Sequence, residues 1–217
     1  MTCLLVMAKA PVAGMAKTRL GAAVGARQAA RVAAAALLDT LDAVLAVPGA
    51  VPVVALTGDL AAAERGAEVA RALARCTIIP QRGRDFGARL ANAHVDVGTL
   101  HSGRSVLQIG MDTPQVSPDL LSESIAELHR PGVDAVLGPA FDGGWWSLGL
   151  RVPAHARVLS AVPMSRADTG EQTLRSLRRL GLCVRPLPEL SDVDTMADAV
   201  RVAKEVPSGR FAAAVAG

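Results

Sequence analysis

The chain has 217 residues and a formal charge of +3, and half of its residues are hydrophobic, a composition typical of a globular protein. Its basic residues form no long block, and aromatic side chains on which bases could stack make up 2% of the chain, so nucleic acid is excluded as the main partner. The apolar start is too short to span a bilayer and leads into a lysine-containing loop, so we expect a cytoplasmic protein without a membrane span, and an oligomer is compatible with the sequence.

Short apolar runs alternate with longer helical stretches, a pattern typical of βα units around a largely parallel sheet. In the first half we expect strands over 2–8, 51–57 and 76–79 and helices over 23–46, 60–74 and 86–97. In the second half we expect strands over 105–111, 134–137, 145–150 and 182–187 and helices over 118–131, 169–180 and 196–206. The strands over 134–137 and 145–150 are too close in sequence for a crossover helix, so they are not predicted to be parallel neighbours. We expect one domain over 1–206 and a frayed tail over 207–217.

The loop after the first predicted strand brings together Lys9, Lys17 and Arg19. Because it leads into a helix, backbone N–H groups and the helix N-terminus favour an anion there, and we predict a phosphate site. The loop is not a Walker A motif, since Ala16 stands where that motif has glycine, and the GxGxxG fingerprint is also absent. A solvated basic loop is the alternative. The candidate nucleotide-binding residues of this loop are Ala8, Lys9, Gly14, Lys17, Thr18 and Arg19.

Aspartates follow two of the later apolar strands. Asp112 comes directly after a strand, where a carboxylate would face the crevice in which open α/β sheets bind ligands, although an Asp–Pro turn also explains it. Asp192 and Asp194 follow the last strand, and in an extended segment both would point to one face and reach one cation. Hard oxygen ligands of this kind suit Mg²⁺ together with substrate phosphates. Asp194 or Thr195 could instead cap the final helix.

The two tryptophans of the chain stand next to an Asp-Gly-Gly segment. The glycines Gly143 and Gly144 would allow the backbone to approach a ligand closely, and Trp145 offers a flat apolar face. A hairpin turn with tryptophan in the core explains the segment equally well, because Asp-Gly is a common hairpin signal. The candidate acceptor-binding residues are Asp142, Gly143, Gly144 and Trp145.

These clusters, in this order, resemble the motifs of the bacterial glycosyltransferase-A-like family within the nucleotide-diphospho-sugar transferase superfamily. The resemblance is carried by residues 8–20, 110–114, 138–150 and 192–198. The segment 85–90, which contains Arg89, resembles a further family segment before a helix. The family usually has tyrosines where this chain has Trp145-Trp146 and often a tryptophan at Met164, so the departures fall on the acceptor side.

The resemblance, and a broader similarity to molybdenum-cofactor and phospholactate guanylyltransferases, implies a fold and a set of ligands. The implied fold is a three-layer α/β/α sandwich with a mixed, mostly parallel sheet of about seven strands. The implied ligands of Mg²⁺ or Mn²⁺ are Asp112 and Asp194, with Asp192 as a further candidate. Arg89 and Asp142 would then position the base or the acceptor.

These features favour a nucleotidyltransferase. The basic loop would bind the triphosphate of an NTP, and a phosphate or phosphonate of the acceptor would attack the α-phosphorus and release pyrophosphate. The candidate catalytic residues are Lys17, Arg19, Asp112 and Asp142. A glycosyltransferase that uses a nucleotide-sugar, with Asp142 as base, is the first alternative, and a nucleotide-binding protein without catalysis is the second.

Overall fold

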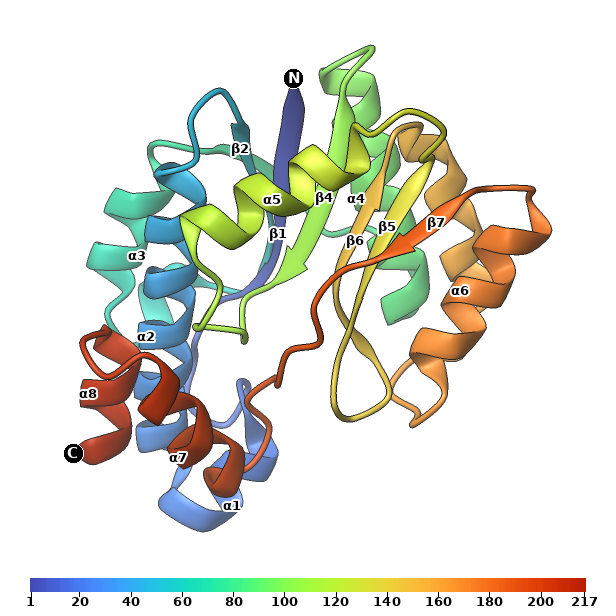
Figure 1. The fold of residues 1–217 in the computed structure, drawn as a ribbon. Helices are drawn as coiled ribbons and strands as arrows, with labels where there is room; N and C mark the ends of the chain where they lie inside the picture. Colours follow the sequence, from blue (N-terminus) through green and yellow to red (C-terminus); the bar gives the residue numbers. More distant parts are fainter.

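The computed structural model describes residues 1–217, apart from the side chain of Thr18, and is built around one seven-stranded sheet (Figure 1). The strands are β1 (Thr2–Lys9), β2 (Val51–Thr57), β3 (Thr77–Pro80), β4 (Ser105–Gly110), β5 (Ala135–Pro139), β6 (Trp145–Leu150) and β7 (Val184–Pro186). They lie in the order β3-β2-β1-β4-β6-β5-β7. β6 runs antiparallel to β4 and β5, whereas the other neighbouring pairs are parallel. The implied mixed, mostly parallel sheet is therefore confirmed.

Helices connect the strands. The α-helices are α1 (Thr18–Val24), α2 (Ala26–Leu45), α3 (Gly66–Leu73), α4 (Phe86–Leu100), α5 (Pro118–Leu128), α6 (Thr169–Arg179), α7 (Met196–Glu205) and α8 (Arg210–Ala216), and the 3₁₀ helices are η1 (Leu60–Ala62) and η2 (Pro153–Ala161). Ser117 caps α5 as predicted, since its Oγ accepts the N–H of Leu120 and Pro118 follows it. Over the described residues, every helix is too short or too polar to cross a bilayer.

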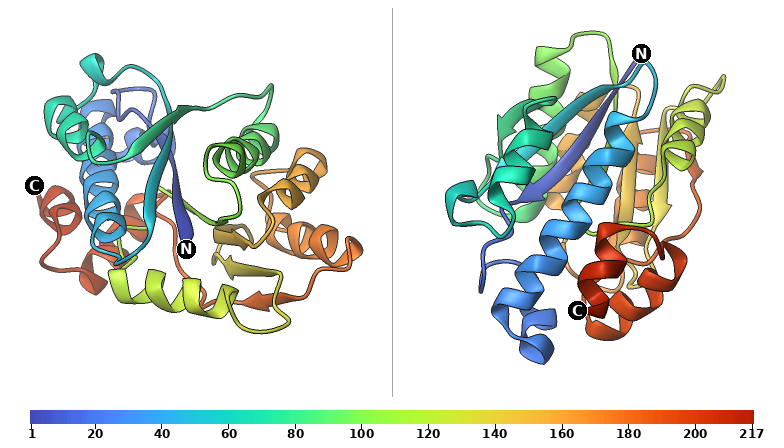
Figure 2. Two further views of the ribbon diagram at one scale, coloured as in Figure 1. Left: turned by 90° about the horizontal axis from the view of Figure 1, so that it is seen from above. Right: turned by 90° about the vertical axis from the view of Figure 1, so that its left-hand side faces the viewer.

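The helices cover both faces of the sheet, so the fold has the three layers that the resemblance implies (Figures 1 and 2). On one face α2, α3 and α5 pack on the strands, with Leu37 and Leu121 in the core. On the other face lie α4, η2 and α6, with Leu90 and Leu177 in the core. A smaller apolar cluster joins α1, α7 and α8 to α2 beyond the edge of the sheet.

The long helix predicted over 23–46 is in fact two helices that meet at Gly25. This glycine has φ 83° and ψ 152°, a conformation outside the helical region, so α1 ends and α2 begins there. The helix predicted over 60–74 is also interrupted. Arg65 takes the left-handed conformation at φ 55°, which separates η1 from α3. In both places a single backbone conformation breaks a sequence whose composition favours a continuous helix.

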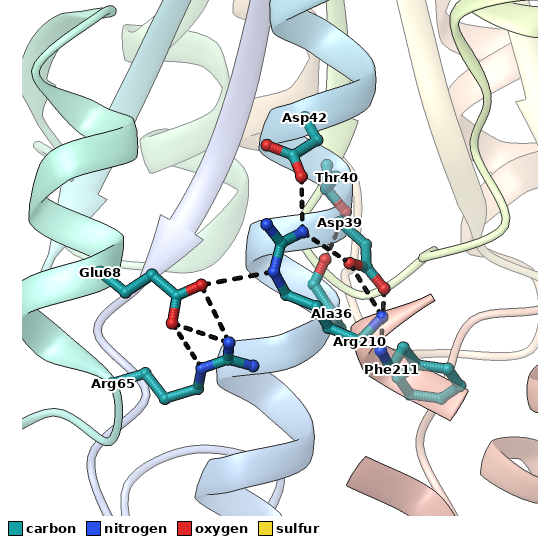
Figure 3. Close-up of polar contacts among 8 residues, drawn as sticks. All are labelled: Ala36, Asp39, Thr40, Asp42, Arg65, Glu68, Arg210 and Phe211. Atoms are coloured by element: carbon teal, nitrogen blue, oxygen red, sulfur yellow. Dashed lines mark hydrogen bonds and ion pairs between the residues drawn. The ribbon is translucent and has the colours of Figure 1, made fainter. Parts of the chain in front are cut away.

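The prediction of a frayed tail from residue 207 is wrong. The tail forms α8, whose Phe211 side chain is fully buried among residues of α2 and α7. Asp39 on α2 accepts the backbone N–H groups of Arg210 and Phe211 at 3.3 and 2.8 Å (Figure 3). The Arg210 guanidinium pairs with Asp39 at 3.2 Å and with Glu68 of α3 at 3.3 Å. One buried aromatic ring and its charged neighbour therefore hold a segment that otherwise consists of small residues.

The parallel strands have their carboxyl ends at the lower edge of the sheet in Figure 1. The parallel strands β1 and β4 end side by side there, with β2 and β3 on one side of this pair and the later strands on the other. Open α/β sheets bind ligands at such a switch point. The β5–β6 connection and the segment after β7 reach the same edge, because β5 and β7 run in the direction of β4.

Candidate functional site

Lys17 lies between two aspartates that are far apart in the sequence. Its Nζ is 2.8 Å from Asp112 Oδ2 and 3.3 Å from Asp194 Oδ1. Arg19 Nη1 adds a third ion pair at 3.1 Å from Asp194 Oδ2. Burial lowers the pKa of Lys17, but the two carboxylates outweigh burial and hold this pKa above its usual value. The side chain is 11% exposed, so Lys17 is a charged, shielded cation between Asp112 and Asp194.

Lys17 reaches this position through an unusual backbone conformation. It has φ 49° and ψ 52°, the left-handed region, directly before α1. A non-glycine residue held there costs on the order of 1 kcal/mol, and such positions cluster at ligand sites. Gly14, in the preceding turn, has φ 76°. It lines neither of the two cavities at this edge of the sheet, so its conformation serves the turn and not a ligand contact. The side chain of Thr18, also predicted to bind nucleotide, lies outside the described part of the structure.

A backbone hydrogen bond attaches the segment after β7 to Asp112, since Val193 N donates to Asp112 O at 3.1 Å. Val193 is buried in the cluster formed with α1 and α7, and its neighbours Asp192 and Asp194 both line one cavity at the sheet edge. Thr195 caps α7 in a capping box, which decides between the two candidate cap residues. The Asp194 carboxylate is therefore available for ion pairs.

Asp192 is surrounded by other carboxylates. Burial, together with the nearby carboxylates of Asp142, Asp112 and Asp194, raises the pKa of this carboxyl to about 6. Lys17 acts in the opposite direction with a smaller effect. A group of carboxylates that repel one another in this way attracts a cation.

Two cavities meet at these carboxylates. The first, the basic cavity, has a volume of about 420 Å³ and is lined by Lys9, Lys17 and Arg89. The second, the acidic cavity, has a volume of about 530 Å³ and is lined by Asp142 and Asp192. The wall that both share consists of Met7, Arg19, Phe86, Gly110, Asp112 and Asp194. A ligand in one cavity would therefore meet a ligand in the other at Asp112 and Asp194.

Most of the predicted nucleotide-binding residues come together in the basic cavity. They are Ala8, Lys9, Lys17, Arg19, Arg89 and Asp112. The Nε atom of Arg89 is buried without a hydrogen-bond partner among the described residues, so it can donate to a ligand. Gln81 also lines this cavity, and its Nε2 donates to the carbonyls of Ala8 and Ala55, both at 2.9 Å. The amide thus ties the end of β3 to β1 and β2.

Of the predicted acceptor residues, Asp142, Gly144 and Trp145 line the acidic cavity. Gly143 does not, because it packs against the loop before α6. A Cβ there would lie 1.9 Å from the carbonyl oxygen of Ala167, and the backbone has φ 86°. Its carbonyl also accepts the N–H of Gly170 at 2.8 Å. The backbone that approaches Gly143 closely is therefore that of Ala167 in the same chain, not a ligand.

The two tryptophans have different positions. Trp146 is buried, and its Nε1 donates to the carbonyl of Pro188 at 2.8 Å, so it is a core residue. Trp145 is partly exposed at the acidic cavity, and its Nε1 donates to Thr173 Oγ1 at 3.2 Å. That bond fixes the ring of Trp145 as a wall of the cavity.

Several residues of the acidic cavity were not predicted from the sequence. The most informative are Gln108 and Thr113, both 1% exposed, with Gln108 Oε1 and Thr113 Oγ1 unpartnered among the described residues. Gln108 lies in the middle of β4. A glutamine inside an otherwise apolar strand was the available signal. The loop before α6, with Ser165 in the left-handed region at φ 58°, had no comparable signal.

The chemistry of the carboxylates fits a divalent cation. Asp112 and Asp194 already converge on one positive charge, the Lys17 ammonium. Among the described side chains, no three His, Cys, Asp or Glu groups form a metal site by themselves. Two carboxylates are nevertheless a usual protein contribution to Mg²⁺, whose other ligands are phosphate oxygens and water.

Several known proteins are similar to this chain. The model of a family described as "Uncharacterized protein conserved in bacteria (DUF2064)" matches residues 40–166. A phosphoenolpyruvate guanylyltransferase of Nocardia farcinica is 33% identical over 121 residues, which cover 54% of this chain and 51% of that protein. The chain thus matches about half the length of this curated relative.

Solved structures share the fold over nearly the whole chain. A proposed nucleotide-diphospho-sugar transferase from Desulfovibrio desulfuricans G20 has a TM-score of 0.85 and 28% identity, covering 99% of this chain and 93% of that one. The Rv0371c protein of Mycobacterium tuberculosis, in complex with manganese, has a TM-score of 0.55 and 21% identity, with coverage of 94% and 98%. The predicted resemblance to the nucleotide-diphospho-sugar transferase superfamily is confirmed.

Proposed function

The chain belongs to the DUF2064 family of bacterial proteins, and we propose that it is a cytoplasmic nucleotidyltransferase. It transfers a nucleoside monophosphate from an NTP to a small acceptor that carries a phosphate or a phosphonate. The name of the guanylyltransferase relative supports nucleotidyl transfer over glycosyl transfer. The two cavities that meet at one pair of carboxylates support a reaction between two separately bound ligands.

The NTP binds in the basic cavity. Lys9, Lys17 and Arg19 provide positive charge for the triphosphate, and Arg89 has a free buried donor. The start of α1 lies beside Lys17, where helix N–H groups favour phosphate oxygens. Lys17 lines the basic cavity as well as contacting both carboxylates, so its ammonium can turn from Asp112 to a phosphate oxygen.

A divalent cation, Mg²⁺ or Mn²⁺, would be held by Asp112 and Asp194, with Asp192 nearby, and would neutralise charge on the phosphate oxygens. The acceptor binds in the acidic cavity. There Asp142 and Asp192 lie on the far side of the shared wall from the basic loop. Asp112 and Asp194 line both cavities, so they stand where the two ligands meet.

In the reaction, an oxygen of the acceptor phosphate attacks the α-phosphorus of the NTP. The bond between the α-phosphorus and the bridging oxygen breaks, and pyrophosphate leaves. A phosphate is already ionised at neutral pH, so no side chain has to remove a proton. Lys17 and Arg19 stabilise the charge that develops on the transferred group and on pyrophosphate, the main protein contribution in phosphoryl transfer.

The observation that carries this proposal is the contact of Lys17 with Asp112 and Asp194 at the boundary of the two cavities. The test is a thermal-shift screen of the four NTPs and common nucleotide-sugars, with and without Mg²⁺, followed by a pyrophosphate-release assay with a panel of small phosphates. An NTP at 100 times its Kd would stabilise the fold by about 2.7 kcal/mol. A nucleotide-sugar that binds and is consumed without pyrophosphate release would establish glycosyl transfer instead. No shift with any nucleotide at millimolar concentration would refute both.

A further inference from the structure

The acidic cavity contains a pair of buried polar groups that the proposed chemistry does not use. Gln108 on β4 and Thr113 after β4 both line it, and each is 1% exposed. Gln108 Oε1 and Thr113 Oγ1 have no hydrogen-bond partner among the described residues. A buried polar group without a partner is destabilising, so a polar ligand that completes these hydrogen bonds would bind more tightly.

The deep part of this cavity has no positive charge. The cations that line it among the described residues are Arg19 and Arg166, whose side chains are 75% and 62% exposed and which pair with Asp194 and Asp168. They stand at the solvent side of the cavity. A carboxylate or second phosphate of the acceptor would meet no buried cation beside Gln108. The neutral amide and the hydroxyl instead suit groups that both donate and accept hydrogen bonds, which are hydroxyls.

The remaining walls fit a carbon skeleton. Leu90 and Met164 line the cavity together with Trp145, whose ring is fixed by its bond to Thr173 Oγ1. A flat aromatic face packs well on the C–H groups of a ring or chain. The volume of about 530 Å³ lies in the usual range for small-molecule sites.

We propose that Gln108 and Thr113 form a specificity subsite for acceptors whose phosphate is carried on a hydroxylated, sugar- or polyol-like skeleton. This inference rests on the proposed function, because it takes the acidic cavity as the acceptor site. The phosphate lies at the shared wall near Asp112, and the hydroxyls reach Gln108 and Thr113. Phosphoenolpyruvate has a carboxylate and no hydroxyl, so it lacks the groups that this subsite recognises.

The test uses glucose 1-phosphate and cyclohexyl phosphate, which share a six-membered ring and a phosphate but differ in hydroxyls. Calorimetry measures the affinity of both for the unaltered chain, for Gln108→Met and for Thr113→Val, in the presence of Mg²⁺. We expect the unaltered chain to bind glucose 1-phosphate at least about tenfold more tightly, and each variant to lose most of this preference, since one net hydrogen bond is worth about tenfold.

Gln108→Met removes an unpartnered polar group and keeps the volume, so its Tm should equal or exceed that of the unaltered chain. Thr40→Val, which changes a buried threonine of α2 that lines neither cavity, serves as the matched control and should keep the preference. The proposal is overturned if neither phosphate binds or if the preference survives in Gln108→Met. If that variant does not fold, Thr113→Val decides in the same way. Failure of the proposed function would show separately, as absent NTP binding or absent pyrophosphate release.

Discussion

Lys17 Nζ lies 2.8 Å from Asp112 Oδ2, and the same ammonium is 3.3 Å from Asp194 Oδ1. A lysine thus occupies the space between the two carboxylates that would hold a divalent cation. The ammonium and the metal therefore compete for Asp112 and Asp194. An NTP removes this competition by offering phosphate oxygens to Lys17, so nucleotide and metal should each raise the affinity for the other.

The first prediction follows from this competition. In Lys17→Met, the affinity for free Mn²⁺ without nucleotide should rise about tenfold, because a fixed positive charge has been removed from the carboxylates. The affinity for NTP should fall at the same time. Titration of Mn²⁺ by electron paramagnetic resonance measures the first quantity and thermal shift the second. Lys9→Met is the matched control, since Lys9 lines the basic cavity and should leave Mn²⁺ affinity unchanged. Unchanged or weaker Mn²⁺ binding by Lys17→Met would contradict the competition between the Lys17 ammonium and the metal.

The second prediction concerns Asp112. In Asp112→Asn, the stabilisation that an NTP gives in the presence of Mg²⁺ should largely disappear. Any turnover should fall by about 10²–10³-fold, because charge stabilisation is the protein's main contribution to catalysis of phosphoryl transfer. The fold should persist, since the backbone carbonyl of Asp112, not its side chain, accepts the N–H of Val193.

Asp142→Asn is the control for this variant. Asp142 lines only the acidic cavity, and an amide oxygen can still accept the N–H of Gly144, which Asp142 Oδ1 accepts at 2.8 Å. Affinity for NTP with Mg²⁺ should therefore be unchanged in Asp142→Asn. If both variants lose nucleotide binding to the same extent, Asp112 has no special part in the metal site.

The features of this site that depend on which residues follow which strand could be predicted from the sequence. Basic residues follow the first strand, and aspartates follow later strands. Because parallel strands end at the same edge of a sheet, this order predicts that these side chains lie together at one edge. Asp112 and Asp194 therefore meet as expected, 82 positions apart in the chain, through Lys17. The short connection before Trp145 also predicted that the strands on either side of it are not parallel neighbours, and β5 and β6 pair antiparallel.

What failed depends on tertiary contacts that local composition does not reveal. Gly143 looked like a ligand-contacting glycine, but the carbonyl of Ala167 is what approaches it. The small residues of the tail predicted fraying, but burial of Phe211 against α2 overrides their weak local preference. Gln108 was not predicted as a site residue, since a glutamine in an apolar strand signals a buried polar group but does not show that a cavity adjoins it.

The third prediction concerns the pH dependence of stability. His94 on α4 is fully buried with both ring nitrogens unpartnered among the described residues, and burial lowers its pKa from 6.5 to about 3. The folded state therefore keeps His94 neutral, whereas the unfolded chain binds a proton below pH 6.5. The stabilisation is fully present above pH 6.5 and is lost as pH falls toward 3.

Between pH 7 and pH 5 this difference should remove about 2 kcal/mol from the free energy of unfolding. Urea unfolding of the unaltered chain and of His94→Leu at both pH values isolates the effect, because Asp192 and the other acids titrate alike in the two proteins. The loss between pH 7 and pH 5 should be smaller by that amount in His94→Leu. Equal pH dependence of the two proteins would show that His94 is not held neutral.

The fourth prediction concerns the docking of α8. Phe211→Ala removes a fully buried ring and should lower the free energy of unfolding by about 3–5 kcal/mol, in the range for buried aromatic residues. Asp39→Ala leaves the N–H groups of Arg210 and Phe211 without their acceptor and should cost about 1–3 kcal/mol. Arg175→Ala is the control, because its ion pair with Glu171 lies on the surface and should change stability by less than about 0.5 kcal/mol. Urea unfolding measures all three. If Phe211→Ala costs no more than Arg175→Ala, the tail contributes nothing to the fold, and the expectation of a frayed end would be restored.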